Sequence, residues 1–201
     1  MSPASPLRRP VSRRRLLQAS GLTLAGGSAA LLAACGDDSS SSDDQGDARA
    51  LNSALAFEHA AVSAYKQTAP LLKGETLAIA RQFGKQDQVH ATALTGAISD
   101  IGGTPVKPKT DAQYAQLLGL ANLNSEQQAL AFLTELEQWG IFTYLEAVPK
   151  IVNHDLRTIA AEIATNDAQH SALLVGAQSG GDPAKQSPEA LVTGTKPPAG
   201  I

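Results

Sequence analysis

Apolar residues recur every three or four positions through four segments of the chain, the spacing that places one buried face on an α-helix. These segments lie near residues 47–72, 75–101, 125–148 and 154–178. Glycine, proline and helix-capping residues separate them, at Lys73-Gly74, Gly102-Gly103-Thr104-Pro105, Asn124-Ser125-Glu126 and between Val148-Pro149 and His154. The pattern predicts an all-α domain over residues 47–178, followed by an irregular tail rich in Gly and Pro over 179–201.

The lengths of the connections predict how these four helices are arranged. The first and last connections are short, so each should join an antiparallel hairpin. The middle connection, roughly residues 102–124, is long enough to cross the full length of a bundle. We therefore expect a four-helix bundle with one long crossover between its second and third helices, rather than a simple up-down-up-down arrangement.

Ionisable residues lie on the apolar face of every predicted helix, near its middle. The expected core positions are Leu51, Leu55, Glu58, Val62 and Tyr65, then Ala80, Phe83, Asp87, His90, Leu94 and Ala97, then Leu130, Leu133, Glu137, Gly140 and Tyr144, and finally Ala160, Ile163, Asp167, His170, Leu174 and Ala177. An Asp and a His three positions apart project from the same side of a helix. Asp87 with His90, and Asp167 with His170, thus form two chelating pairs.

Burying these charges without compensation would be unfavourable, since each isolated carboxylate in a dry core costs on the order of several kcal/mol. The predicted core face holds no lysine or arginine. Carboxylate and imidazole ligands suit iron, manganese or zinc, so a metal centre would supply the missing positive charge. A hydrogen-bonded Asp–His network without metal is the alternative.

The two halves of the predicted bundle repeat the same pattern. The segment from Phe57 to Tyr65 aligns with the segment from Leu136 to Tyr144, and the two Glu-x6-Tyr spacings lie 79 residues apart. The two Asp-x-x-His pairs lie 80 residues apart. Two helical hairpins related by a pseudo-two-fold axis would bring both sets of ligands to the bundle centre.

This pattern resembles the ferritin-like superfamily, in particular its bacterioferritin and rubrerythrin members and the exported ferritin-like domain proteins of bacteria. In that family, a Glu seven residues before a Tyr on helices one and three, and Glu-x-x-His on helices two and four, hold two iron or manganese ions. The resemblance implies the following roles: Glu58 and His90 on one metal, Glu137 and His170 on the other, Asp87 and Asp167 in place of bridging glutamates, and Tyr65 and Tyr144 as hydrogen-bond partners of the carboxylates.

The two aspartates depart from the family pattern, because each is one methylene shorter than glutamate. The helices must then approach more closely for the carboxylates to span two metals. The small neighbours Gly84 and Gly140 would permit that approach. We expect His59 and His154 to lie at the surface, outside the site.

The N-terminal segment, residues 1–34, has the pattern of an export signal. Ser12-Arg13-Arg14-Arg15-Leu16-Leu17-Gln18 is a twin-arginine pattern, and the apolar run 22–34 that follows is too short for a stable membrane span. The run closes with Leu32-Ala33-Ala34-Cys35, which resembles a bacterial lipobox, in which the cysteine is lipidated and becomes the mature N-terminus. Residues 35–46, acidic and rich in serine, would form a solvated tether.

Charge, composition and the length of the tail argue against several classes of function. The signal holds five of the 16 basic residues, so the remainder has eleven against 19 acidic residues and a formal charge of −8, which argues against nucleic acid as a partner. A single cysteine excludes the CxxC pairs of a rubredoxin-type domain. The tail offers no fifth helix for a bacterioferritin-like storage cage, although a smaller homo-oligomer stays open.

Two functions remain as alternatives. The first is a di-iron or di-manganese centre, in which zinc could also bind, that reacts with oxygen or peroxide outside the cytoplasm in the manner of an oxidase or ferroxidase. The second is a non-catalytic lipoprotein of the envelope, metal-binding or metal-free, that serves as an adaptor or structural module.

The lipobox interpretation predicts the behaviour of Cys35→Ala. More than one acyl chain makes membrane attachment durable, so the variant should leave the membrane fraction and lack the mass of the lipid. Cell fractionation and intact-mass analysis measure both effects, with Ser41→Ala in the neighbouring segment as the control. A Cys35→Ala protein that still fractionates with membranes would contradict the lipid anchor.

Overall fold

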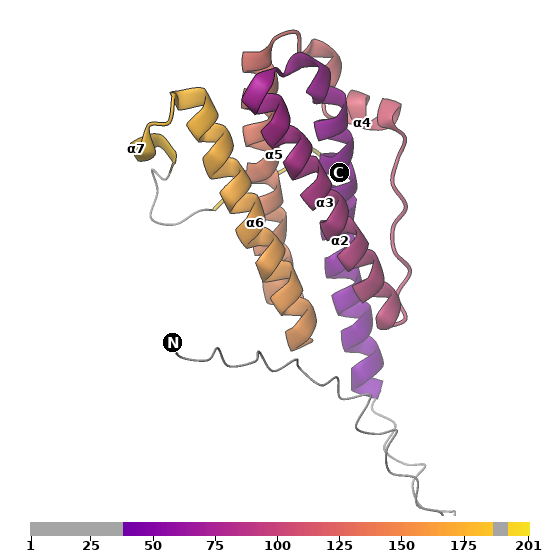
Figure 1. Cartoon of the computed structure of the whole chain (residues 1–201). Coiled ribbons are helices and arrows are strands. Elements are labelled where there is room, and N and C mark those ends of the chain that lie inside the picture. The colour runs from indigo at the N-terminus through magenta and orange to yellow at the C-terminus, as the bar shows by residue number, and fades with distance from the viewer. Residues whose placement is uncertain (1–37, 187–192) are drawn as a thin grey trace, which may run out of the picture. The chain divides into compact units, whose positions relative to one another are not determined.

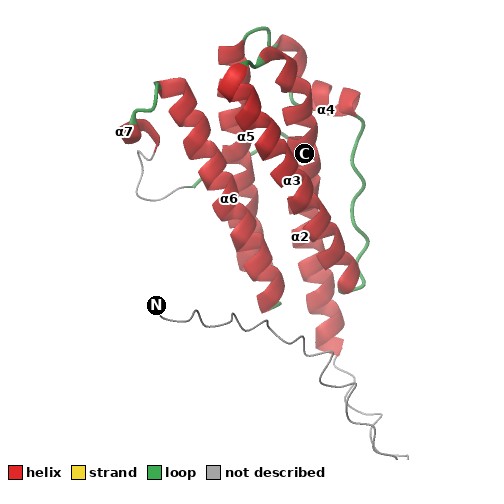
Figure 2. Ribbon diagram, viewed as in Figure 1, coloured by secondary structure: helices red, strands yellow, loops and turns green. Residues whose placement is uncertain are grey.

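The computed structural model describes residues 38–186 and 193–201, and it contains only helices, turns and loops among them (Figures 1 and 2). The main helices are α2 (Asp38–Thr68), α3 (Gly74–Asp100), α5 (Glu126–Ala147) and α6 (His154–Ser179), and shorter ones are α4 (Asp111–Leu117), α7 (Pro183–Gln186) and the 3-10 turns η1 (Ala69–Leu71), η2 (Leu120–Asn122) and η3 (Val148–Lys150). The predicted all-α class is confirmed. The twin-arginine pattern, the apolar run and the lipobox with Cys35 lie outside the described residues.

Helix α2 begins at Asp38, nine residues before its expected start, so most of the segment predicted as a tether is helical in the structure. Asp and Ser are favoured in the first turn of a helix, where their oxygens can accept unpaired backbone N–H groups and negative charge suits the helix dipole. The sequence DSSSSDD therefore extends the helix instead of ending it.

Local sequence signals set the other helix ends close to where they were expected. Pro70 ends the regular helix in η1, because proline cannot donate the next backbone hydrogen bond. Ser125 caps α5 by accepting the N–H of Gln128, and Asn153 caps α6. Helix α6 ends at Ser179, and the residue that follows, Gly180, has a φ of +68° that favours glycine.

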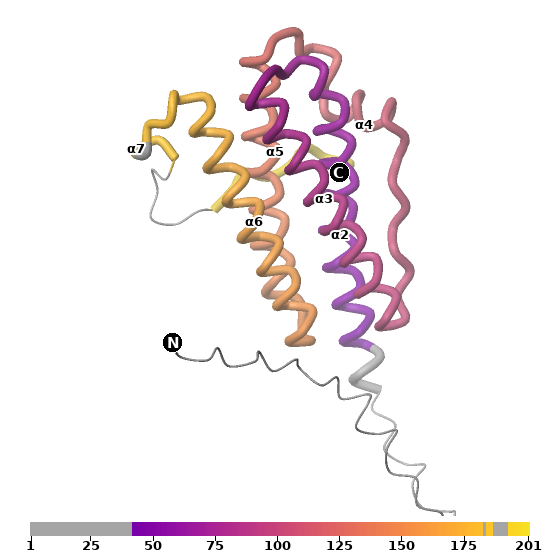
Figure 3. Tube along the Cα trace, viewed as in Figure 1, coloured from indigo at the N-terminus to yellow at the C-terminus, as the bar shows by residue number. Residues whose placement is uncertain are grey.

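The four main helices form two antiparallel hairpins, α2 with α3 and α5 with α6, and α2 also packs against α5 (Figure 1). The crossover between α3 and α5 runs along α2 and contains α4 (Figure 3). Asn52 holds it at one end by accepting the N–H of Val106 at 2.7 Å and donating to the carbonyl of Thr104 at 3.0 Å. The predicted crossover between the second and third helices is thus confirmed.

The apolar core divides into two clusters, and the predicted ionisable residues lie between them on every main helix. One cluster holds the later half of α2 with the early halves of α3 and α5, and reaches Leu174 on α6. The other holds the early half of α2, the later halves of α3 and α5, and α6 up to Ile163. Three of the expected core positions differ, because Val62 and His90 are only half-buried and Ala177 is exposed.

In the described part of the C-terminal tail, residues 193–201 are irregular and residues 183–186 form the short helix α7. Its last described segment packs on α5, where the N–H of Thr195 donates to the carbonyl of Gln138 at 3.1 Å. Gly194, with a φ of +65°, lies so close that a Cβ there would sit 2.5 Å from that carbonyl oxygen. None of the described helices is long and apolar enough to span a membrane.

A buried aspartate near the start of α2 predicts a stability effect. Asp47 is 1% exposed and accepts the backbone N–H groups of Val152 and Asn153 at 2.7 and 2.9 Å, which ties α2 to the α5–α6 connection. Asp47→Ala should lower the free energy of unfolding by about 1–3 kcal/mol, because two donors lose a charged acceptor. Urea unfolding measures the loss, and Asp43→Ala at an exposed position of the same helix should show almost none.

Candidate metal centre

Six ionisable side chains meet in the layer between the two apolar clusters. They come from all four main helices: Glu58 from α2, Asp87 and His90 from α3, Glu137 from α5, and Asp167 and His170 from α6. Five are buried and His90 is half-buried. All six residues predicted as metal ligands therefore share one site, although they are spread over more than a hundred positions of the chain.

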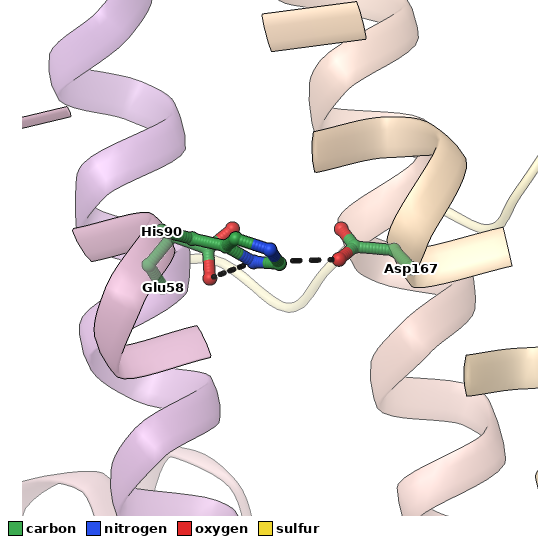
Figure 4. Close-up of side chains that lie close together, drawn as sticks. All are labelled: Glu58, His90 and Asp167. Carbon is green, nitrogen blue, oxygen red and sulfur yellow. Dashed lines mark ion pairs between the residues drawn. The ribbon is translucent and has the colours of Figure 1, made fainter. Parts of the chain in front are cut away.

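The first half of the site joins Glu58, His90 and Asp167 across the bundle (Figure 4). The Nδ1 atom of His90 lies 3.4 Å from Glu58 Oε2 and 3.9 Å from Asp167 Oδ1. Each residue offers one ligand atom, and the three ligand atoms all lie within 4.8 Å of one another. Such a group can coordinate a single cation.

The second half joins Asp87, Asp167 and His170 within the same limit. The Nδ1 atom of His170 lies 3.5 Å from Glu137 Oε1, so this glutamate completes the second half as Glu58 completes the first. Asp87 Oδ1 lies 3.8 Å from the Nδ1 atoms of both histidines. The two aspartates therefore lie between the halves, and each glutamate lies beside one histidine.

The two buried tyrosines connect the halves through hydrogen bonds to the glutamates. Tyr144 on α5 donates to Glu58 on α2 at 2.5 Å, and Tyr65 on α2 donates to Glu137 on α5. Each tyrosine thus bonds the glutamate of the opposite hairpin. Burial raises the pKa of both tyrosines well above its ordinary value, and the nearby carboxylates add to this, so both hydroxyls keep their protons.

Two residues that contact His170 were not singled out from the sequence. His170 Nε2 donates to the side-chain oxygen of Gln86 at 2.8 Å, and its ring stacks on Phe83 with the ring centres 3.9 Å apart. Phe83 was expected only as core, and Gln86 carries no periodic signal of its own. The internal repeat could have drawn attention to Gln86, because a residue with a side-chain amide precedes the aspartate in both halves, as Gln86 and Asn166.

The predicted glycines lie where the structure needs small residues. A Cβ on Gly140 would stand 2.8 Å from Asp167 Oδ2 and equally close to the ring of Phe57. A Cβ on Gly84 would stand 2.9 Å from the Cβ of Tyr65. Because glycine has no side chain, α5 can lie close to Asp167, and α3 can lie close to α2. Such close approach compensates for the shorter reach of aspartate compared with glutamate.

Burial dominates the electrostatics of the carboxylates. It raises the pKa of Glu58 although His90 and the bond from Tyr144 act in the opposite direction. Burial, followed by repulsion from Glu137 and Glu58, raises the pKa of Asp87 well above its ordinary value. The same causes raise the pKa of Asp167. In the absence of a cation these groups therefore resist ionisation.

The set of possible ligand atoms fits bound metal better than a hydrogen-bonded network without metal. Glu58 Oε2, Asp87 Oδ2, His90 Nδ1, Asp167 Oδ2 and His170 Nδ1 are buried without any hydrogen-bond partner. Buried polar atoms are normally paired, and an Asp–His network would pair these atoms with one another. No described lysine or arginine pairs with any of these carboxylates. Carboxylate oxygens and imidazole nitrogens gathered in one buried cluster are the ligands that Fe, Mn and Zn prefer.

Comparison with known sequences identifies the family. A family profile described as a ferritin-like domain matches residues 46–179. The chain belongs to the ferritin-like domain family. The match spans the four main helices, including all six ionisable residues of the site. A search of curated proteins found no match.

Two solved structures share the ferritin-like fold with this chain. A conserved hypothetical protein from Mycobacterium tuberculosis has a TM-score of 0.62 at 20% identity, covering 68% of this chain and 93% of that one. A ferritin-like, diiron-carboxylate protein from Bacillus anthracis has a TM-score of 0.55 at 20% identity, covering 68% and 97%. At this level of identity the similarity establishes the fold alone.

The raised pKa values predict how the metal-free protein responds to neutralising its aspartates. The double variant Asp87→Asn with Asp167→Asn should raise the free energy of unfolding at neutral pH by on the order of 0.5–3 kcal/mol, because it replaces buried acids with neutral isosteres. Denaturant unfolding of chelator-treated protein measures this change. Glu135→Gln, at an exposed position of α5, should leave the stability nearly unchanged.

The gain from the double variant should depend on pH in one direction. The unfolded aspartates ionise near pH 4, whereas the folded ones hold their protons to higher pH, so wild-type stability falls as pH rises between these two pKa values. The double variant has asparagine at both positions, so its free energy of unfolding does not fall with pH for this reason. The advantage of the variant should therefore shrink on acidification and vanish below about pH 4. An advantage that grows on acidification would show that the aspartates are ionised hydrogen-bond partners.

Proposed function

We propose that this protein uses its ferritin-like bundle to hold two iron or manganese ions, and that the pair reacts with dioxygen or peroxide. The observation that carries the proposal is the set of five buried side-chain atoms without a hydrogen-bond partner, all of them within the cluster of six ionisable residues. The diiron-carboxylate description of the Bacillus anthracis relative supports iron as one candidate. Zinc also suits these ligands but would be redox-inactive.

The geometry supports a specific division of the ligands. Glu58 and His90 would hold one ion, and Glu137 and His170 would hold the other, because each glutamate lies beside one histidine. Asp87 and Asp167 would lie between the two ions. Four carboxylates would balance the charge of two divalent cations, which removes the electrostatic cost of the buried layer.

The protein's own residues determine the environment of this reaction. Bound reduced ions would supply two one-electron equivalents to an oxidant such as peroxide. Tyr65 and Tyr144 orient Glu137 and Glu58 and keep their protons, so each holds a proton at its hydroxyl within reach of a carboxylate. The apolar clusters on both sides exclude bulk water, and the half-buried His90 leaves one side of the centre closer to solvent.

We further propose that the bundle acts outside the cytoplasm. The twin-arginine pattern is typical of proteins exported in a folded state, which would allow metal loading before export. The lipobox would then anchor the protein through Cys35 to the outer face of the bacterial cell membrane, on the periplasmic or cell-surface side. Residues 36–46 would connect the lipid to the bundle.

Metal analysis of purified variants tests the centre. Wild-type protein purified after native export should contain about two Fe or Mn ions per chain, as in carboxylate-bridged bundles. His170→Ala should lose at least half of this metal, because a buried ligand is removed. His154→Ala should retain it, since His154 is exposed at the start of α6. Elemental analysis measures the content, and circular dichroism checks that both variants are helical.

Redox reactivity separates the enzyme-like function from a metal-binding scaffold. Protein loaded anaerobically with Fe(II) should oxidise it faster than the His170→Ala variant when peroxide or oxygen is added, as followed by absorbance. Wild-type protein that is fully helical but carries and binds no metal would instead favour a non-catalytic envelope lipoprotein.

A further inference from the structure

The two histidines of the centre are equivalent in the internal repeat but differ in their surroundings. The side chain of His170 is 1% exposed, whereas that of His90 is 12% exposed. His170 also stacks on Phe83 and donates from Nε2 to Gln86. His90 Nε2 makes no hydrogen bond to any residue in the described part of the chain. The site is therefore asymmetric despite its symmetric sequence pattern.

Two substitutions between the repeats account for this asymmetry. With the spacing of 80 residues, Gln86 corresponds to Asn166, and Phe83 corresponds to Ile163. Asparagine is one methylene shorter than glutamine, and the Asn166 side chain forms no hydrogen bond with His90 in the structure. Isoleucine offers no aromatic face for the His90 ring. His90 thus lacks both contacts that hold its counterpart.

The Gln86 contact selects one tautomer of His170. An amide oxygen can only accept, so the proton of the neutral imidazole lies on Nε2 and Nδ1 carries a lone pair. Nδ1 is the atom that faces Glu137 and Asp87 at 3.5 and 3.8 Å. His170 is therefore held in the tautomer that a metal ligand needs, whereas no described side chain selects the tautomer of His90.

We propose that Gln86 is a positioning residue that makes the two metal positions unequal. The Glu137–His170 position takes up the first ion and holds it more tightly, because its ligands are preorganised and shielded. The Glu58–His90 position binds the second ion more weakly and exchanges it with solvent. This inference rests on the proposed function, since it needs a centre that binds two ions.

Titration of the metal-free, full-length protein with Co²⁺ tests this inequality without relying on activity. The wild type should bind two ions in separate steps, and His170→Ala should lose the tighter step while His90→Ala loses the weaker one. Gln86→Leu should weaken the tighter step by about 10–100-fold, the usual effect of removing the partner of a ligating histidine. Gln86→Glu, which keeps an acceptor at the same reach, should restore it.

Asn166→Leu is the matched control, because it changes the amide at the corresponding position of the other half. It should leave both steps within about twofold of wild type, since His90 receives no hydrogen bond from Asn166. Equal losses in Gln86→Leu and Asn166→Leu, or no loss in Gln86→Leu, would overturn the inequality. A wild type that binds no Co²⁺ would instead refute the proposed function itself.

The tautomer can be measured on metal-free protein, independently of metal binding. Nitrogen-15 NMR at a pH where the imidazoles are neutral should show His170 protonated at Nε2 alone in the wild type and in Gln86→Glu. In Gln86→Leu the Nδ1-protonated form should appear. A wild-type His170 protonated at Nδ1, or a tautomer unchanged in Gln86→Leu, would remove Gln86 as a positioning residue even if two ions bind.

Discussion

The burial of four carboxyl groups in one layer is the constraint on which the rest of this structure depends. Glu58, Asp87, Glu137 and Asp167 share one layer with two histidines and no lysine or arginine. If all were ionised and unpaired, their separation from water would cost at least as much as a domain's net stability of about 5–15 kcal/mol. Burial raises the pKa of Glu58, Asp87 and Asp167, which favours their neutral form when no cation is present. A bound cation would offset the same cost.

The helix packing around this layer follows from the short reach of the aspartates. Gly140 lets α5 lie against Asp167, and Gly84 lets α3 lie against Tyr65 on α2, so small residues bring the four helices together at the level of the site. The tyrosines then join the hairpins, because each donates to a glutamate on the other one. The two apolar clusters pack on both sides of this layer and separate it from bulk water.

The internal repeat explains both the symmetry of the ligands and the difference between their surroundings. Because the Glu, Asp, His and Tyr positions occur in both repeats, the same candidate ligands and the same tyrosine lie on each side of the pseudo-two-fold axis. Their surroundings differ, because Gln86 and Phe83 contact His170, whereas the corresponding residues Asn166 and Ile163 form no such hydrogen bond or ring stack with His90. The two halves of the site, built from the same residue types, therefore differ in the exposure and the contacts of their histidines.

The sequence alone determined the helical class, the crossover and the six residues that share the site, because helical periodicity and polar residues on an apolar face are local signals. It did not determine that α2 starts at Asp38, since a serine-rich acidic run is compatible with either a tether or a helix start. Nor could it reveal Asp47 bonding the α5–α6 connection, or Gln86 bonding His170, because each joins helices far apart in sequence. Which histidine is shielded depended on the side chains that the folded bundle places around each ring, and only the tertiary structure decides that.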